Sequence, residues 1–186
     1  TPAPLSVHRK SKIKIPTIAS DAGSERLRKV INKGMTKEDI LAAVETLVEN
    51  DILNLSRYVM VGLPTETMDD VEEITDLCKR IKHSFLKFSR PKKRMGEITV
   101  SLNSFVPKPF TPFQWCAMDD VSMLKKKIKK IKADLKSVAN VRVNADVPRW
   151  AYIQALLSRG DRKVANILSS SHKAGGNWAQ TLKKSP

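Results

Sequence analysis

The sequence has few of the residues that build metal and disulfide sites. Its only cysteines, Cys78 and Cys116, form no CxxC, CxxxCxxC or Cys/His cluster, so we expect ordinary thiols and no metal site made by this chain alone. The three histidines, His8, His83 and His172, also lack ligand spacing. No apolar run approaches the roughly 20 residues of a membrane helix. No apolar signal core opens the chain, so we expect no membrane partner and a cytoplasmic location.

Acidic residues are scarce relative to basic ones. The 34 Lys and Arg against 19 Asp and Glu give a formal net charge of +15. This charge favours phosphate-bearing partners such as RNA, or an acidic protein surface, by an attraction that salt weakens. The basic runs at 90–94 and 125–132 could equally be solvated faces of the protein. Aromatic residues make up only 5% of the chain and few lie outside one loop, which gives base stacking little support.

Short segments rich in β-forming residues alternate with helical patterns along the chain. Strands are predicted at 13–19, 55–62 and 98–106. Helices are predicted from Glu25 to the stop at Gly34, and then at 36–50, 67–85 and 119–138. This order predicts an α/β fold, a parallel (β/α) barrel fragment of about three βα units with the basic helix 119–138 packed on its sheet. A strand at 140–145 and helices at 148–158 and 161–173 follow.

Three unusual loops follow the predicted strands, at the edge where parallel α/β sheets carry their sites. In residues 20–26 (SDAGSER), Gly23 permits close backbone approach, and the amides of the helix start could hold a carboxylate or a ribose hydroxyl. A plain helix start capped by Ser24 explains the same residues more simply. Residues 62–67 (GLPTET) are likewise explained by a simple strand-to-helix turn.

The third loop, residues 103–115 (NSFVPKPFTPFQW), combines three prolines with several aromatic residues. The prolines restrict the backbone and remove donors, which favours a stiff extended path. Phe105, Phe110, Phe113 and Trp115 supply large apolar faces. We predict a half-buried wall of a pocket here and not an exposed polyproline ligand.

In this order and spacing the loops resemble one group of radical S-adenosylmethionine (SAM) proteins. These are iron–sulfur oxidoreductases in which a cobalamin-binding-like domain often precedes the radical domain. The resemblance rests on residues 23–36 (GSERLRKVINKGMT), 58–67 (YVMVGLPTET), 101–115 (SLNSFVPKPFTPFQW) and 156–168 (LLSRGDRKVANIL). It implies a six-stranded partial (β/α) barrel whose CxxxCxxC loop holds a [4Fe–4S] cluster, and which cleaves SAM to a 5′-deoxyadenosyl radical. Cobalamin is a further cofactor that the resemblance allows for the whole protein.

On this resemblance the chain is the later half of the barrel. A flexible lead (1–12) precedes strands four to six (13–138), the family's C-terminal extension (139–178) and a polar tail (179–186). The chain lacks an initiating methionine and the cluster motif, so we expect it to be a piece of a longer enzyme, inactive alone, whose first partner is the missing N-terminal half. Exposed strand edges would favour self-association.

The resemblance also implies site residues, although it assigns no catalytic residue. The SAM contacts expected from the first two loops are Ser20, Asp21, Gly23, Ser24, Val61, Gly62, Leu63 and Pro64. Ser20 and Asp21 occupy the positions of a Pro-Glu pair in the family, and Ser104 stands where relatives often have proline. The substrate candidates in the third loop are Asn103, Phe105 and Lys108.

Two other functions fit the composition. One is a basic nucleic-acid-binding module that recognises RNA. The other is a structural α/β module whose basic face docks an acidic partner domain. A steep fall of RNA affinity with salt would favour the first.

Overall fold

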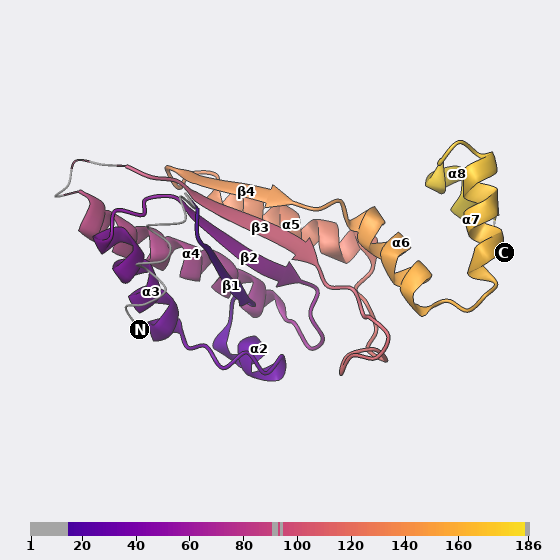
Figure 1. Ribbon diagram of the computed structural model, residues 1–186, viewed down its shortest axis with the longest axis horizontal. Coiled ribbons are helices and arrows are strands. Elements are labelled where there is room, and N and C mark those ends of the chain that lie inside the picture. The colour runs from indigo at the N-terminus through magenta and orange to yellow at the C-terminus, as the bar shows by residue number, and fades with distance from the viewer. Residues whose placement is uncertain (1–14, 91–92, 94, 185–186) are drawn as a thin grey trace.

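The computed structural model describes residues 15–90, 93 and 95–184, and its centre is a parallel sheet in the strand order β1-β2-β3-β4 (Figure 1). The strands are β1 (Thr17–Asp21), β2 (Leu55–Val61), β3 (Ile98–Ser104) and β4 (Val141–Ala145). Each connection between them contains at least one helix. The alternation confirms the predicted α/β fold, a partial barrel with C-terminal helices.

The strand predicted at 140–145 is present as β4, and it pairs with β3 in the same sheet, from Ile98↔Val141 to Leu102↔Ala145. The division of the chain at residue 138 stays a prediction. β1 begins after Pro16, because a proline has no N–H to give to a strand ladder. The remainder of that predicted strand, 13–14, the predicted lead 1–12 and His8 lie outside the described residues.

The helices between the strands begin at the predicted caps. They are α2 (Glu25–Val30), α3 (Lys37–Glu49), α4 (Met68–Ser89) and α5 (Val121–Leu135). The Ser24 hydroxyl accepts from the Leu27 N–H, and Thr36 and Thr67 each form a capping box. α2 is shorter than predicted, and within its apolar stripe Leu27 is buried whereas Val30 is exposed.

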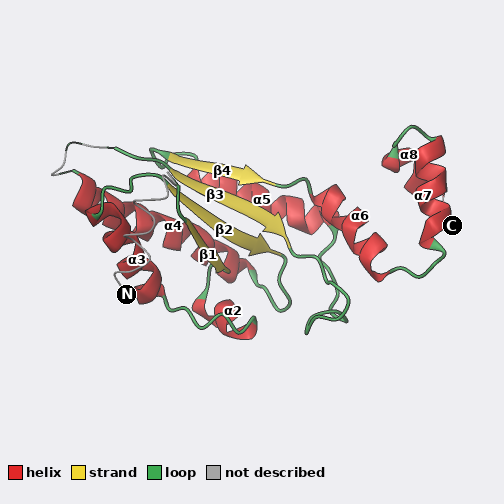
Figure 2. Cartoon of the chain, in the orientation of Figure 1, coloured by secondary structure: helices red, strands yellow, loops and turns green. Residues whose placement is uncertain are grey.

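Helices α3, α4 and α5 cover one face of the sheet (Figure 2). The core between these layers is aliphatic, and α5 enters it as predicted, through Leu124, Ile128, Ile131 and Leu135. Lys127, in the basic run 125–132, is buried and so does not lie on a solvated face of α5. The opposite face of the sheet carries no helix of the described residues, and Tyr58 is exposed there.

The C-terminal helices extend away from the sheet (Figure 1). They are α6 (Pro148–Arg159), α7 (Val164–Lys173) and α8 (Trp178–Lys184). α6 contacts α5, and α7 contacts α8. α8 occupies most of the predicted polar tail, of which 185–186 lie outside the described residues. Within the described part of the chain, no helix is both long and apolar enough to cross a bilayer.

Candidate functional site

The three loops singled out in the sequence meet at the carboxyl edge of the sheet. A small apolar cluster joins Ala22 and Leu27 after β1, Leu63 after β2 and Phe105 after β3. The Phe105 N–H also donates to the Val61 carbonyl at 2.8 Å. Figure 1 shows α2 and the loops after β2 and β3 gathered beyond the arrowheads of the strands. The edge is therefore one continuous site built from three separate segments.

The end of β1 carries the first two predicted SAM contacts. The strand bulges between Ala19 and Asp21, and Asp21 has a positive φ of 57°. The Ala22 N–H turns back to donate to the Ser20 carbonyl at 2.6 Å. The Asp21 carboxylate stays partly exposed and pairs with Lys33 at 2.6 Å. Asp21 is thus at the site but already holds one cation.

Two buried arginines fix this loop from behind. Arg28 donates through Nη1 to the Gly23 carbonyl at 2.7 Å and through Nε to the Met35 carbonyl at 2.8 Å. Arg57, in the middle of β2, donates to Ser20 Oγ and to the Ile74 carbonyl, each at 3.1 Å. Burial lowers the pKa of the Arg57 guanidinium to about 10. The two arginines supply hydrogen bonds that the Gly23 carbonyl and the Ser20 hydroxyl would otherwise make to water. The loop is therefore rigid where it meets the sheet.

Asp70, at the start of α4, ties the first loop to the second. It accepts from the Ser24 hydroxyl at 2.6 Å, from the Thr67 N–H at 2.8 Å, and from the Arg26 guanidinium in an ion pair. Arg26 also donates to the Thr65 carbonyl at 2.8 Å. Burial alone would raise the pKa of the Asp70 carboxyl, but the hydrogen bonds from Arg26, Ser24 and Thr67 outweigh it and hold the pKa well below its ordinary value.

The second loop is anchored by a buried ion cluster. Gly62 has a φ of 84° and donates its N–H to Glu66 Oε2 at 2.7 Å. The same oxygen accepts from Lys127 Nζ at 2.8 Å, and Lys127 also reaches Asp119 Oδ2 at 2.7 Å. Burial would lower the pKa of the Lys127 amine, but the two carboxylates outweigh it and raise that pKa. A Cβ on Gly62 would lie 2.7 Å from Leu124 Cδ2, so glycine is needed both for the backbone angle and for this contact with α5.

The third loop is only partly the predicted wall. Phe105 is buried and meets the Phe113 ring edge to face, with centroids 6.2 Å apart. Phe110 and Trp115, in contrast, are 96% and 83% exposed, so the prediction of a half-buried wall is wrong for these two. Lys108 is exposed as well.

Asn103 lies on β3, facing the uncovered side of the sheet. With its amide oriented so that the nitrogen faces acceptors, it donates to Asp146 Oδ2 at 3.0 Å. Ser104, next in the strand, has a buried hydroxyl with no hydrogen-bond partner. The structure thus brings Asn103 and Phe105 to the edge and leaves Lys108 outside it.

Sequence reasoning missed the buried charges that hold the site, Arg28, Arg57, Asp70 and Lys127. For Arg57 a signal exists: alternation in 55–61 (LSRYVMV) places it on the same side of the strand as Leu55 and Val59. Lys127 falls between the apolar positions of α5 and gives no such signal. Within the described ranges, no group of three or more His, Cys, Asp or Glu side chains is placed to hold a metal, and Cys78 and Cys116 are free thiols.

Comparison with known proteins gives a family match for the first part of the chain. Residues 3–78 match the model of the Radical SAM superfamily. An uncharacterized protein of Methanocaldococcus jannaschii is 36% identical over 160 residues, which are 86% of this chain and 33% of the relative. The chain thus spans about a third of that relative's length.

Shorter matches come from enzymes named for tRNA modification. The tRNA-2-methylthio-N(6)-dimethylallyladenosine synthase of Syntrophus aciditrophicus is 34% identical over 90 residues, 47% of this chain and 19% of the relative. The threonylcarbamoyladenosine tRNA methylthiotransferase of Aquifex aeolicus is 33% identical over 70 residues, 37% of this chain and 17% of the relative. The matched segment, residues 3–78, belongs to the radical SAM superfamily. It contains β1, β2 and Asp70, whose bonds to Ser24 and Thr67 join the loops after these strands; we call this arrangement the Asp70 clamp.

Proposed function

We propose that this chain supplies one wall of the SAM site in a longer radical SAM enzyme. The observation that carries the proposal is the convergence of three loops at one sheet edge, within a chain of this superfamily. When bound, the cluster and SAM supply the electron and the radical. The residues of this chain position SAM and keep water from it. The cysteines that hold the cluster would come from a segment outside this sequence, and the chain alone would then be inactive.

The polar groups at this edge suit a ligand that contains a nucleoside. At the end of β1 the Asp21 carboxylate is partly exposed and can accept from a ligand hydroxyl. At the end of β3, with β2 between the two strands, the buried Ser104 hydroxyl has no partner. Gly23 and Ser24 are committed elsewhere: a Cβ on Gly23 would strike Ile74, and the Ser24 hydroxyl is held by Asp70. We therefore assign Asp21 and the backbone of 61–64 to SAM contact, and Gly23 and Ser24 to positioning of the loop.

Substitution of Asp21 tests this assignment. In the cluster-loaded full-length protein, Asp21→Ala is expected to weaken equilibrium SAM binding about tenfold or more, because a charge-assisted hydrogen bond to a hydroxyl is lost. Asp21→Glu should retain most of the affinity. Lys33→Met, which removes only the cation that Asp21 holds, should leave affinity equal or improve it.

Isothermal titration calorimetry gives the affinities, and cleavage of SAM to 5′-deoxyadenosine under reduction tests the reaction class. Unchanged SAM affinity in Asp21→Ala would remove this residue from the site. A cluster-loaded protein that neither binds nor cleaves SAM would contradict the proposed function as a whole.

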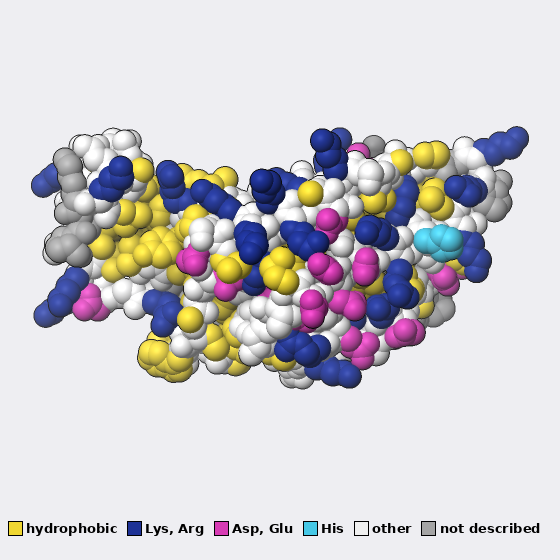
Figure 3. Space-filling view, turned by 180° about the vertical axis from the view of Figure 1, so that it is seen from behind, with side chains coloured by type: hydrophobic (Ala, Val, Ile, Leu, Met, Phe, Trp, Pro, Cys, Tyr) yellow, Lys and Arg dark blue, Asp and Glu magenta, His cyan; other side chains and the backbone are white. Residues whose placement is uncertain are grey.

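A second candidate function concerns the substrate, which we propose to be RNA. The C-terminal helices expose Trp150 and Tyr152 on α6, with Arg149 beside them. Figure 3 shows apolar side chains gathered over the C-terminal helices with Lys and Arg around them. Aromatic faces among basic side chains suit single-stranded RNA, whose bases stack while the phosphates are neutralised.

The RNA proposal predicts a specific loss. Trp150→Ala should weaken binding of a tRNA by about 1–3 kcal/mol, the cost of one stacking platform. Trp115→Ala, at a more exposed tryptophan of the third loop, is the control, and RNA affinity should change less in it than in Trp150→Ala. Affinity should also fall steeply between 50 and about 200 mM salt. Filter-binding or fluorescence anisotropy gives both measurements, and salt-independent binding would contradict an RNA substrate.

A further inference from the structure

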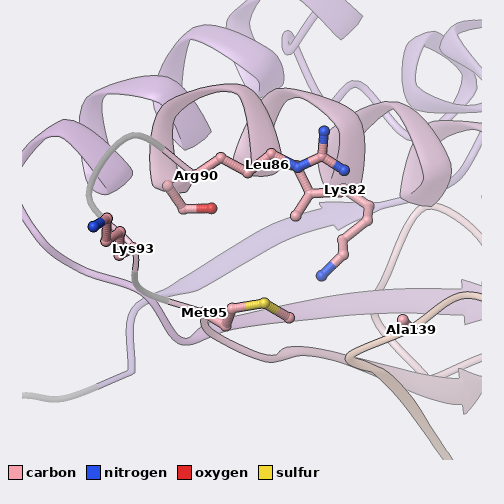
Figure 4. A pocket seen from close by; sticks show the side chains of 7 residues that line it. Lys82, Leu86, Arg90, Lys93, Met95 and Ala139 are labelled. Carbon is pink, nitrogen blue, oxygen red and sulfur yellow. The ribbon is translucent and has the colours of Figure 1, made fainter.

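A cavity of about 380 Å³ lies at the end of the sheet opposite the SAM edge, between the C-terminal half of α4 and the segments that lead into β3 and β4 (Figure 4). Its polar lining is Lys82, Ser89, Arg90 and Lys93. None of the lining residues that the structure describes is acidic. It belongs to none of the three loops of the candidate site.

The floor of the cavity holds a buried ammonium group without a counter-ion. Lys82 is 6% exposed and its Nζ has no hydrogen-bond partner; the Phe85 ring lies 5.6 Å from Nζ to the centroid. Figure 4 shows the Lys82 side chain leaving α4 and pointing into the space above Met95. Burial lowers the pKa of this amine. An unpaired buried charge is costly, so an anion bound next to the Lys82 ammonium group would be stabilised by an ion pair.

A second buried group lines the same space. Ser89 is 1% exposed, and its hydroxyl also has no partner. Lys82 and Ser89 therefore offer two unused donors within one cavity. Buried polar groups are hydrogen-bonded in the great majority of cases. Two buried donors without partners in the same cavity therefore indicate a ligand-binding site.

The cationic lining exceeds what the helix end requires. The last carbonyls of α4 carry about half an elementary negative charge, which one nearby cation balances. Lys82, Arg90 and Lys93 supply three, and none of them forms an ion pair with another described residue. The cavity thus keeps a net positive charge.

The remaining lining is apolar. Leu86, Met95 and Ala139 complete the described lining of the cavity. The volume lies near the lower end of small-molecule pockets, which span roughly 300–1,000 Å³. A bare inorganic ion would leave this apolar part empty.

We propose that this cavity binds a small organic anion, with a phosphate or carboxylate group against Lys82 and Ser89 and an apolar portion against Leu86 and Met95. The site is remote from the SAM edge and independent of the reaction proposed there. RNA backbone phosphate is a different partner, and the test separates it.

The test titrates the full-length protein with n-butyl phosphate, hexanoate and inorganic phosphate by calorimetry. At least one organic anion should bind saturably and more tightly than inorganic phosphate. Lys82→Met should weaken that binding about tenfold or more, since it removes the buried charge. Lys79→Met, which removes the same charge from the exposed side of α4, should leave it unchanged. Preference for the phosphate or the carboxylate probe identifies the anionic group.

Two further measurements keep the result unambiguous. Lys82→Met should raise the melting temperature without ligand, because an uncompensated buried charge is removed, so loss of binding cannot be assigned to unfolding. Ser89→Ala, which keeps the charge, should weaken binding severalfold. The proposal is overturned if no organic anion binds saturably, or if inorganic phosphate binds as tightly as the organic anions. It is also overturned if Lys82→Met and Lys79→Met lose equal affinity for the organic anion, or if only an RNA oligonucleotide binds in a way that depends on Lys82.

Discussion

Replacement of Asp70 by alanine is expected to destabilise the protein by about 2–4 kcal/mol, because it removes the carboxylate of the α4 capping box and leaves a buried hydroxyl without its acceptor. The hydroxyl is that of Ser24, whose residue is only 6% exposed. Arg26 contributes less, since its side chain is half exposed and solvent screens the pair. Urea unfolding monitored by circular dichroism gives the free energy of unfolding.

The matched control is Asp69→Ala. Asp69 lies one position earlier in the first turn of α4, is exposed, and also faces the positive end of the helix dipole. Its loss should cost about 0.3–1 kcal/mol, the dipole contribution alone. Equal losses in the two variants would show that the bonds of Asp70 to Ser24 and Arg26 add nothing to stability.

The Asp70 clamp also predicts a pH dependence. Because the folded-state pKa of Asp70 lies below its ordinary value, the clamp stabilises the protein fully above the unfolded-state pKa of about 3.9 and loses that contribution as the pH falls through the folded-state pKa. The difference in stability between wild type and Asp70→Ala should therefore be constant near neutral pH and shrink below about pH 4. A difference that stays constant down to pH 2 would contradict the assignment.

The clamp matters for the proposed function because Asp70 fixes the spacing of two loops that we propose to contact SAM. Asp70 touches Ser24 after β1 and Thr67 after β2, so its loss frees both at once. We expect Asp70→Ala to weaken SAM binding while leaving the anion cavity at Lys82 intact, since that cavity lies toward the other end of α4.

The fold followed from local patterns, because each strand and helix boundary depends on a few neighbouring residues. Thr36 and Thr67 predict helix starts through a side chain that bonds three residues away, and the structure has both. The pairing of β4 with β3 was not predicted, because a five-residue strand of half-exposed residues carries no sign of its pairing partner. Pairing is a long-range property, and the periodicity of one segment does not contain it.

The candidate site was found in outline but not in its supports. The sequence placed three loops at one edge, since parallel strands end at the same side of a sheet. It could not show that Arg28 holds the Gly23 carbonyl or that Lys127 joins Glu66 to Asp119, because these contacts join residues distant along the chain. It also gave Phe110 and Trp115 a buried role from residue type alone, whereas both are exposed in the described structure.

Gly23→Ala is expected to destabilise the protein by about 1–3 kcal/mol or more, as overpacking of a tight contact does. A Cβ at this position would lie 2.5 Å from the Ile74 backbone nitrogen and 2.8 Å from its Cα. Both of these contacts are to the Ile74 backbone, and the added Cβ would also meet the Ile74 side chain. Because the backbone cannot yield as a side chain can, the start of α2 must move away from α4. The loop that carries Asp21 would move with it, so SAM affinity should fall as a consequence.

Two comparisons separate packing from direct ligand contact at Gly23. Gly34→Ala is the control, because no atom lies within 4 Å of its added Cβ, and it should be neutral or stabilise by about 0.4–1 kcal/mol through the unfolded chain. Ile74→Ala in the Gly23→Ala background removes the side-chain part of the clash but leaves the backbone part, so it should restore neither stability nor SAM affinity. If Gly23→Ala instead keeps full stability and loses only SAM affinity, Gly23 contacts the ligand directly, and its place is at the SAM wall and not in the packing of α2 against α4.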